Sequence, residues 1–527
     1  MTEHDASSRA GTPASAPSAA DLSVPAGSSQ PASVPAMTAA EPSAAAGPRS
    51  KSARKSPDRL GTMRVGKLLL EFSIPAIVSM IFNSLYNVVD TAFLGWAVGD
   101  AGVAVTTLAL PVMNILMGFS MIAGQGGNAL SAIQLGEGRK ADAERTLGNS
   151  ATLLIVLAVA VAVASIVLID PVLALIGTTP DLYEPTKSFV QIVCVGFMFQ
   201  SLGLGLNNFL RTVGKPVFAL VTMVIGTLVC VVLNAWFVLG LGWGVAGSAY
   251  ATVLGQACGM VPVLWYFVFN RHAVLRLRLS LMTPDLRLMA RILALGLASF
   301  VMQVAATAVN IVANQLLTFY GAADPLGSTG ALAAIGTAMK VIMFTFVPVI
   351  GLIMGAQPII GYNYGAGNWQ RVLDTLKWAS VAATVMMLFF WALVHLIPEQ
   401  IIGLFGITGE LRDFTVTVLK IDTILFPVIG FQVVGSSYFQ SSGQPLKAAI
   451  LEMTRQVIFL IPLYLVLPIV LPAFGITPLT AMVVAVPGSD LLACVTTAIF
   501  VVLEVKRLRR KRDAANALAA EPEGIAA

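Results

Sequence analysis

Residues 147–170 read LGNSATLLIVLAVAVAVASIVLID, an apolar run whose only charged side chain, Asp170, stands at its end. A helix of this length crosses the roughly 30 Å of hydrocarbon in a bilayer. Backbone groups in lipid must be satisfied within the segment, so such a run predicts a helix. The chain has twelve such stretches, near residues 68–96, 105–130, 147–170, 186–210, 216–240, 245–269, 290–320, 331–358, 376–398, 413–440, 446–471 and 478–504. The sequence therefore predicts an all-α polytopic membrane protein.

The composition agrees with this fold class. Of the 527 residues, 57% are hydrophobic and 11% are charged, whereas a soluble domain carries about 25% charged residues. Cys194, Cys230, Cys258 and Cys494 lie in apolar stretches without paired spacing, which excludes a secreted disulfide scaffold. The net charge of +5 comes from basic residues that flank the spans. We therefore expect no nucleic-acid partner.

Basic residues predict the orientation of the chain. With the N-terminus inside, the inside segments hold nearly all the flanking Lys and Arg residues, and the outside loops hold only Lys187 and Arg412. This bias predicts that both termini are cytoplasmic. The expected location is the plasma membrane, with the bilayer as a partner.

The sequence predicts that the chain divides into five parts. Residues 1–60 are rich in Ala, Ser, Pro and Gly and are expected to be a disordered cytoplasmic tail without a signal peptide. The rest divides into an N-terminal lobe, a cytoplasmic inter-lobe loop, a C-terminal lobe and a basic cytoplasmic tail, at residues 61–270, 271–289, 290–505 and 506–527.

The two halves repeat. At a shift of 229 residues, Gly126 coincides with Gly355 and Gly136 with Gly365, and Gly214 and Pro216 coincide with Gly443 and Pro445. Six spans repeated in parallel are typical of a secondary transporter built from two six-helix lobes.

Several motifs make the chain resemble the MATE family (multidrug and toxic compound extrusion), in particular its branch of DinF and MepA. They are Tyr86-Asn-Val-Val-Asp90 in the first span, Leu135-Gly-Glu-Gly-Arg-Lys in the second loop, Gln357-Pro-Ile-Ile-Gly-Tyr-Asn-Tyr-Gly-Ala-Gly367, and Tyr438-Phe-Gln-Ser-Ser-Gly-Gln-Pro445. The resemblance implies two lobes around a central cavity. It also implies drug export by alternating access, driven by entry of protons or sodium.

Asp90 is the first candidate for ion coupling. It lies about two-thirds along the first span, where an unpaired charged carboxylate is costly and a proton or a cation makes it tolerable. The alternative is a helix-end Asp that reaches interfacial water. The resemblance adds Cys230 and Asn234 on the fifth span, where the family has Asn and Asp, and Ser248 and Thr252 on the sixth. Because the candidate site has a single carboxylate beside a Cys, we expect the coupling ion to be a proton. Sodium is the alternative. Asn234 alone is equally consistent with a helix–helix hydrogen bond.

Further polar residues within the spans are candidates for substrate binding. Packing between helices is the alternative for them, and for Lys340 the alternatives are snorkelling or pairing with an acid. The candidates are Asn87, Asn114, Gln303, Asn310, Asn314, Lys340 and Gln357. Glu452 and Arg455, three residues apart on one span, are predicted to form an ion pair with each other.

Other classes of function lack their motifs. No Walker A loop, HExxH or GxSxG is present, and the three histidines are scattered. We expect no ATP-driven step, no enzyme activity, no metal site and no cofactor beyond the coupling ion, H+ or Na+. The prediction is a monomeric, cation-coupled antiporter of small cationic or amphipathic compounds. The alternatives are a lipid-linked oligosaccharide flippase, another twelve-span carrier, a membrane enzyme, and a receptor or channel.

Overall fold

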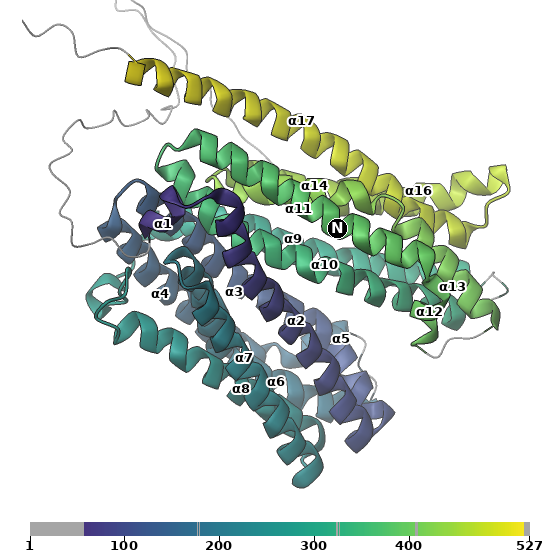
Figure 1. Cartoon of the computed structure of the whole chain (residues 1–527). Coiled ribbons are helices and arrows are strands. Elements are labelled where there is room, and N and C mark those ends of the chain that lie inside the picture. Colours follow the sequence, from purple (N-terminus) through teal and green to yellow (C-terminus); the bar gives the residue numbers. More distant parts are fainter. Residues whose placement is uncertain are drawn as a thin grey trace, which may run out of the picture. The chain divides into compact units, whose positions relative to one another are not determined.

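A computed structural model describes residues 57–176, 178, 180–322, 325, 327–405 and 409–520. The predicted tail at residues 1–60 lies outside this part except for the start of a short helix, α1 (Pro57–Thr62). The elements assigned in the described residues are all helical, as predicted. Figure 1 shows them as long rods that run back and forth beside one another.

The first half of the chain forms the N-terminal lobe. Its helices are α2 (Val65–Val98), α3 (Asp100–Gly136), α4 (Lys140–Val167), α5 (Ile169–Leu175), α6 (Pro180–Thr212), α7 (Pro216–Asn234), the π-helix η1 (Ala235–Gly240) and α8 (Gly244–Val268).

The 3-10 turn η2 (Leu279–Leu281) interrupts the segment that leads to the C-terminal lobe. The helices of that lobe are α9 (Leu286–Gly321), α10 (Gly327–Gly365), α11 (Trp369–Leu396), α12 (Pro398–Gly403), α13 (Gly409–Asp422), α14 (Phe426–Ser441), α15 (Pro445–Met453), the π-helix η3 (Thr454–Leu460), α16 (Ile461–Val470), the 3-10 turn η4 (Leu471–Phe474) and α17 (Pro478–Ala520).

The number of spans agrees with the prediction. In the described residues, eleven helices are long and apolar enough to cross a membrane, and α13 with α14, bent by 51°, makes a twelfth. Large apolar side chains such as Val163 and Phe389 are exposed on the spans, as expected where lipid is the solvent. Buried apolar clusters fill both lobes, and two of them cross between the lobes: one includes Phe72 of the N-terminal lobe, and another includes Ile292 of the C-terminal lobe. The protein is therefore a multi-pass membrane protein.

The two ends of the helices differ in charge. We call the end that carries α1 and the loops 137–139, 213–215, 269–285, 366–368 and 442–444 the basic end. There Arg371 donates hydrogen bonds to the carbonyls of Leu60 and Met63, at 3.0 and 2.6 Å, which fixes α1 against α11.

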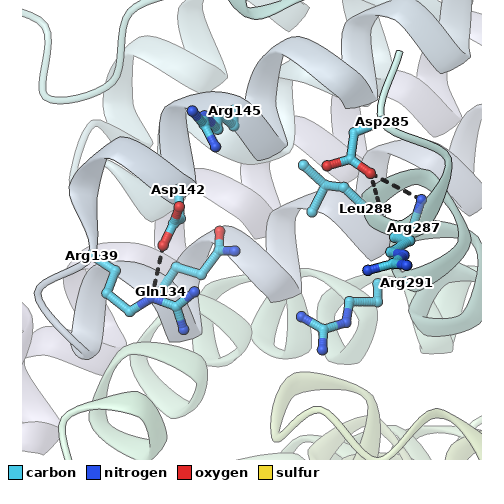
Figure 2. Close-up of a pocket in the computed structure, with 8 residues that line it drawn as sticks. All are labelled: Gln134, Arg139, Asp142, Arg145, Asp285, Arg287, Leu288 and Arg291. Carbon is cyan, nitrogen blue, oxygen red and sulfur yellow. Dashed lines mark hydrogen bonds and ion pairs between the residues drawn. The ribbon is translucent and has the colours of Figure 1, made fainter. Parts of the chain in front are cut away.

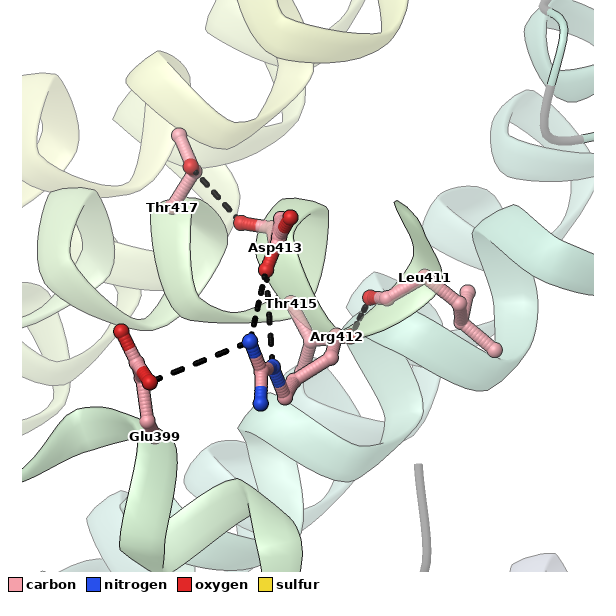
Figure 3. Close-up of polar contacts among 6 residues, drawn as sticks. All are labelled: Glu399, Leu411, Arg412, Asp413, Thr415 and Thr417. Atoms are coloured by element: carbon pink, nitrogen blue, oxygen red, sulfur yellow. Dashed lines mark hydrogen bonds and ion pairs between the residues drawn. The ribbon is translucent and has the colours of Figure 1, made fainter. Parts of the chain in front are cut away.

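At the opposite end, two cations stand among carboxylates. Lys187 lies 3.0 Å from Asp170. Arg412 lies 3.8 Å from Glu399 and 3.5 Å from Asp413, as Figure 3 shows. Exposed ion pairs of this kind add little stability. The carboxylates do offset the positive charge of Lys187 and Arg412, the two cations that the sequence analysis assigned to the outer loops.

The two lobes touch through the halves of their helices nearest the basic end, where α3 packs on α9 and α2 on α10. A Cβ on Gly126 would lie 2.1 Å from the carbonyl oxygen of Ile292, and one on Gly136 would lie 2.0 Å from that of Tyr362. No side chain fits at these distances. Gly355 and Gly365, the repeat partners of these two glycines, lie against Ser73 and Ile133 of the other lobe. The repeated glycines thus mark the surface through which each lobe meets the other.

A polar cluster within the C-terminal lobe corrects one prediction. Arg455 pairs with Asp490 of α17, at 2.6 Å, and not with Glu452. The Glu452 carboxylate instead accepts a hydrogen bond from the Ser436 hydroxyl at 2.7 Å. The chain begins a π-helix at Thr454, so the ordinary i,i+3 geometry that would join Glu452 and Arg455 does not hold across this point.

We expect Arg455→Leu to destabilise the protein strongly, because the partner carboxylate of Asp490 is only 2% exposed. Removing one member of a buried pair costs about 3–5 kcal/mol. The double variant Arg455→Leu/Asp490→Leu should recover most of that loss. Thermal unfolding in detergent measures both, and a double variant no more stable than Arg455→Leu would contradict this interpretation.

Candidate functional site

Asp90 lies in the last third of α2, in the half of the helix away from the basic end, and is half-buried. Its Oδ1 accepts two hydrogen bonds, from Asn234 Nδ2 at 2.8 Å and from Ser248 Oγ at 2.7 Å. The three residues come from α2, α7 and α8, which pack together. The structure therefore assembles around Asp90 the residues expected from the fifth and sixth spans.

The backbone next to the site is irregular. Asn234 is the last residue of α7, and the chain continues as the π-helix η1. Single π-helical turns occur often at functional sites because they displace side chains from the ordinary helical register. Ser248 lies one turn from Thr252 on α8, so both side chains are on the same face of that helix.

Cys230 and Thr252 form the next layer of the site. The amide of Asn234 lies 3.6 Å from Cys230 Sγ, and the Thr252 hydroxyl lies 3.9 Å from the same sulfur. Cys230 also packs in a small buried cluster with Phe237 and Ala251. All five residues predicted for ion coupling are thus joined in one network.

The chemistry of this network is that of a carboxylate held by neutral groups. No Lys, Arg or His of the described residues forms an ion pair with Asp90, and its hydrogen-bond donors are an amide and a hydroxyl. Asn234 Oδ1 is buried and accepts no hydrogen bond from any described residue. A buried acceptor without a donor is costly, so a proton-bearing group or a small cation beside it would be stabilised. Sodium would find oxygen ligands here, but the sulfur of Cys230 is a poor ligand for a hard cation.

The predicted substrate residues fall in two places. Asn114 on α3, Asn310 and Asn314 on α9, and Lys340 on α10 all lie in the half away from the basic end. Asn114 is half-buried and the other three are exposed. Gln303 lies near the middle of α9 and packs against α3. A Cβ added to Gly118 of α3 would lie 3.4 Å from the Cβ of Gln303. The side chain of Asn87 lies outside the described part of the structure.

Gln357 is separate from these residues. Its amide nitrogen lies 3.4 Å from Gln440 Oε1, and Gln440 Nε2 donates to Ser299 Oγ at 2.6 Å. The Ser299 hydroxyl in turn donates to Gln125 Oε1 of the other lobe at 3.2 Å. The chain of polar groups therefore joins the lobes in their contact region, and Gln357 belongs to that contact.

Sequence reasoning did not identify Gln125, Ser299 and Gln440 as a unit. The available signal was the presence of polar residues within apolar spans, which marks a buried contact without naming its partner. Asp422 and Asp490, both buried in the C-terminal lobe, carry the same signal.

Comparisons with known proteins agree with this architecture. The sequence model of the MatE family matches residues 75–236 and 305–466, one segment in each lobe. The chain is 24% identical over 415 residues to the multidrug export protein MepA of Staphylococcus aureus (strain MSSA476), covering 78% of this chain and 89% of that protein. It is 24% identical over 413 residues to MepA of Staphylococcus haemolyticus (strain JCSC1435), with 78% and 88% covered.

Solved structures share the fold. A MATE family transporter of the MOP superfamily in an outward-facing conformation superposes with a TM-score of 0.79 at 20% identity, covering 86% of this chain and 99% of that one. A MATE in the straight conformation gives 0.79 at 21% identity, with the same coverage. The match in both halves, the twelve spans and the internal repeat lead to one conclusion: the chain belongs to the MATE family and is of the MepA-like type.

Proposed function

We propose that this protein is a proton-coupled antiporter that exports small cationic or amphipathic compounds by alternating access. The observation that carries the proposal is the half-buried carboxylate of Asp90, held by Asn234 and Ser248 without a cationic partner. Such a group gains or loses a proton as its surroundings change, which is what coupling to a proton gradient requires. The names of its MepA relatives, multidrug export proteins, support the class of substrate.

In this proposal the protein works as a monomer in the plasma membrane with the basic end in the cytoplasm. The lobes are in contact at that end. With this orientation, the structure would correspond to a state closed to the cytoplasm. Asp90 and the exposed residues Asn310, Asn314 and Lys340 lie in the opposite half, where the substrate would leave. Protonation of Asp90 would weaken its attraction for a cationic compound at this stage.

Uptake of ethidium into everted vesicles, whose outer surface is the cytoplasmic face, tests the proposal because it measures export. We expect export to stop when the proton gradient is collapsed and to continue when only the sodium gradient is collapsed. Loss with the sodium gradient alone would assign coupling to a sodium site at Asp90, Asn234 and Thr252. Export that survives both treatments would contradict ion coupling altogether.

A further inference from the structure

A second polar site lies at the basic end, whereas Asp90 lies in the opposite half of the helices. It is a pocket of about 290 Å³ between the start of α4 and the start of α9, shown in Figure 2. Three arginines line it: Arg145 from α4, and Arg287 and Arg291 from α9. The pocket thus takes cationic groups from both lobes.

These three guanidinium groups have no carboxylate partner among the described residues. None of them forms a hydrogen bond or an ion pair through its side chain with any described residue. The fourth arginine of the pocket, Arg139, is engaged by Glu137 at 2.9 Å and Asp142 at 2.8 Å. Asp285 is also close, but its carboxylate accepts from the backbone N–H groups of Arg287 and Leu288 as the cap of α9. The lining therefore holds four arginines against two carboxylates, Asp142 and Asp285, and keeps a net positive charge.

The pocket also has a buried donor. Gln134 is 5% exposed and lines the pocket from α3. Its Oε1 is occupied, because it accepts from the Thr146 hydroxyl at 2.8 Å. This fixes the side chain and leaves its NH2 group, which has no partner among the described residues, as a donor for a ligand.

We infer that this pocket binds a phosphate group, supplied by the headgroup of an anionic phospholipid or by a soluble phosphate compound. Like charges held close together repel, and the negative charge of a phosphate group offsets that repulsion. The planar guanidinium donates two parallel hydrogen bonds to phosphate oxygens, which favours phosphate over chloride. The inference is independent of the proposed export activity, because it concerns other residues and another ligand.

The test measures thermal stabilisation of the purified full-length protein by two probes. One probe is inorganic phosphate, compared with chloride at equal ionic strength in phosphatidylcholine nanodiscs. The other is phosphatidylglycerol, mixed in equal amounts with phosphatidylcholine. We expect at least one probe to raise the Tm of the wild type. Stabilisation by the lipid alone identifies the headgroup as the source, whereas stabilisation by free phosphate identifies a soluble ligand.

The variant Arg145→Gln/Arg291→Gln should lose this stabilisation, with binding about tenfold weaker for each arginine removed. The matched control is Arg271→Gln/Arg278→Gln, which removes the same charge from exposed arginines of the inter-lobe segment outside the pocket. The control should respond to the probes as the wild type does. Absence of stabilisation by both probes, or an equal loss in the control, would overturn the inference.

Discussion

Asp90→Asn should abolish coupled export of ethidium, reducing the rate to that of vesicles without the protein. Asparagine has nearly the same shape as aspartate and keeps an oxygen that can accept from Asn234 and Ser248. It cannot bind or release a proton in the physiological range. The expected loss therefore comes from the missing ionisation, and the rate of energised ethidium uptake by everted vesicles measures it.

The matched control is Asp181→Asn, the same substitution at an exposed carboxylate in the first turn of α6. It should export at the wild-type rate. Both variants should unfold at similar temperatures, since the change at Asp90 keeps the packing. If Asp90→Asn exports as fast as the wild type, Asp90 has a structural role only.

The second large effect is expected from Gly126→Leu. The first atom of the new side chain would lie 2.1 Å from the carbonyl oxygen of Ile292, so α3 and α9 have to separate. Overpacking of a tight contact costs about 1–3 kcal/mol or more. We expect transport to fall to background and the population to shift toward states that are open at the basic end.

The distance between spin labels at Glu137 and Ala366, placed in a Cys258→Ser background, measures this shift. Both sites are exposed, and they lie beside the contact of Gly136 with Tyr362 and Ala366. Gly336→Leu is the control, because a Cβ at this α10 glycine would meet no atom within 4 Å. An unchanged distance in Gly126→Leu, or the same change in the control, would contradict the assigned role of this contact.

Much of the fold could be predicted from the sequence, because lipid allows few solutions. An apolar run such as 147–170 has to be a helix, and its length fixes one crossing. The repeat was visible because glycines such as Gly126 and Gly355 serve the same contact in both lobes. The bend between α13 and α14 was not predicted, since residues 413–440 were interpreted as one span although Lys420 and Asp422 interrupt the apolar residues before Pro427.

The candidate site was predictable in composition but not in geometry. Asp90 could be named because a carboxylate within a span is costly, and the four residues around it could be named from the resemblance to the MATE family. The π-helix after Asn234 has no sequence signature that we could use. Arg455 shows the limit of local spacing: its partner Asp490 is 35 residues away in the chain, and only the packing of η3 against α17 joins them.

The central claim is that a proton on Asp90 and a cationic substrate exclude each other. Release of protons on addition of ethidium to the purified protein, in weakly buffered detergent solution, tests it most directly. The account predicts that the wild type releases protons as the dye binds and that Asp90→Asn binds dye without releasing any. Equal release from both proteins, or dye binding by the wild type with no release, would contradict it.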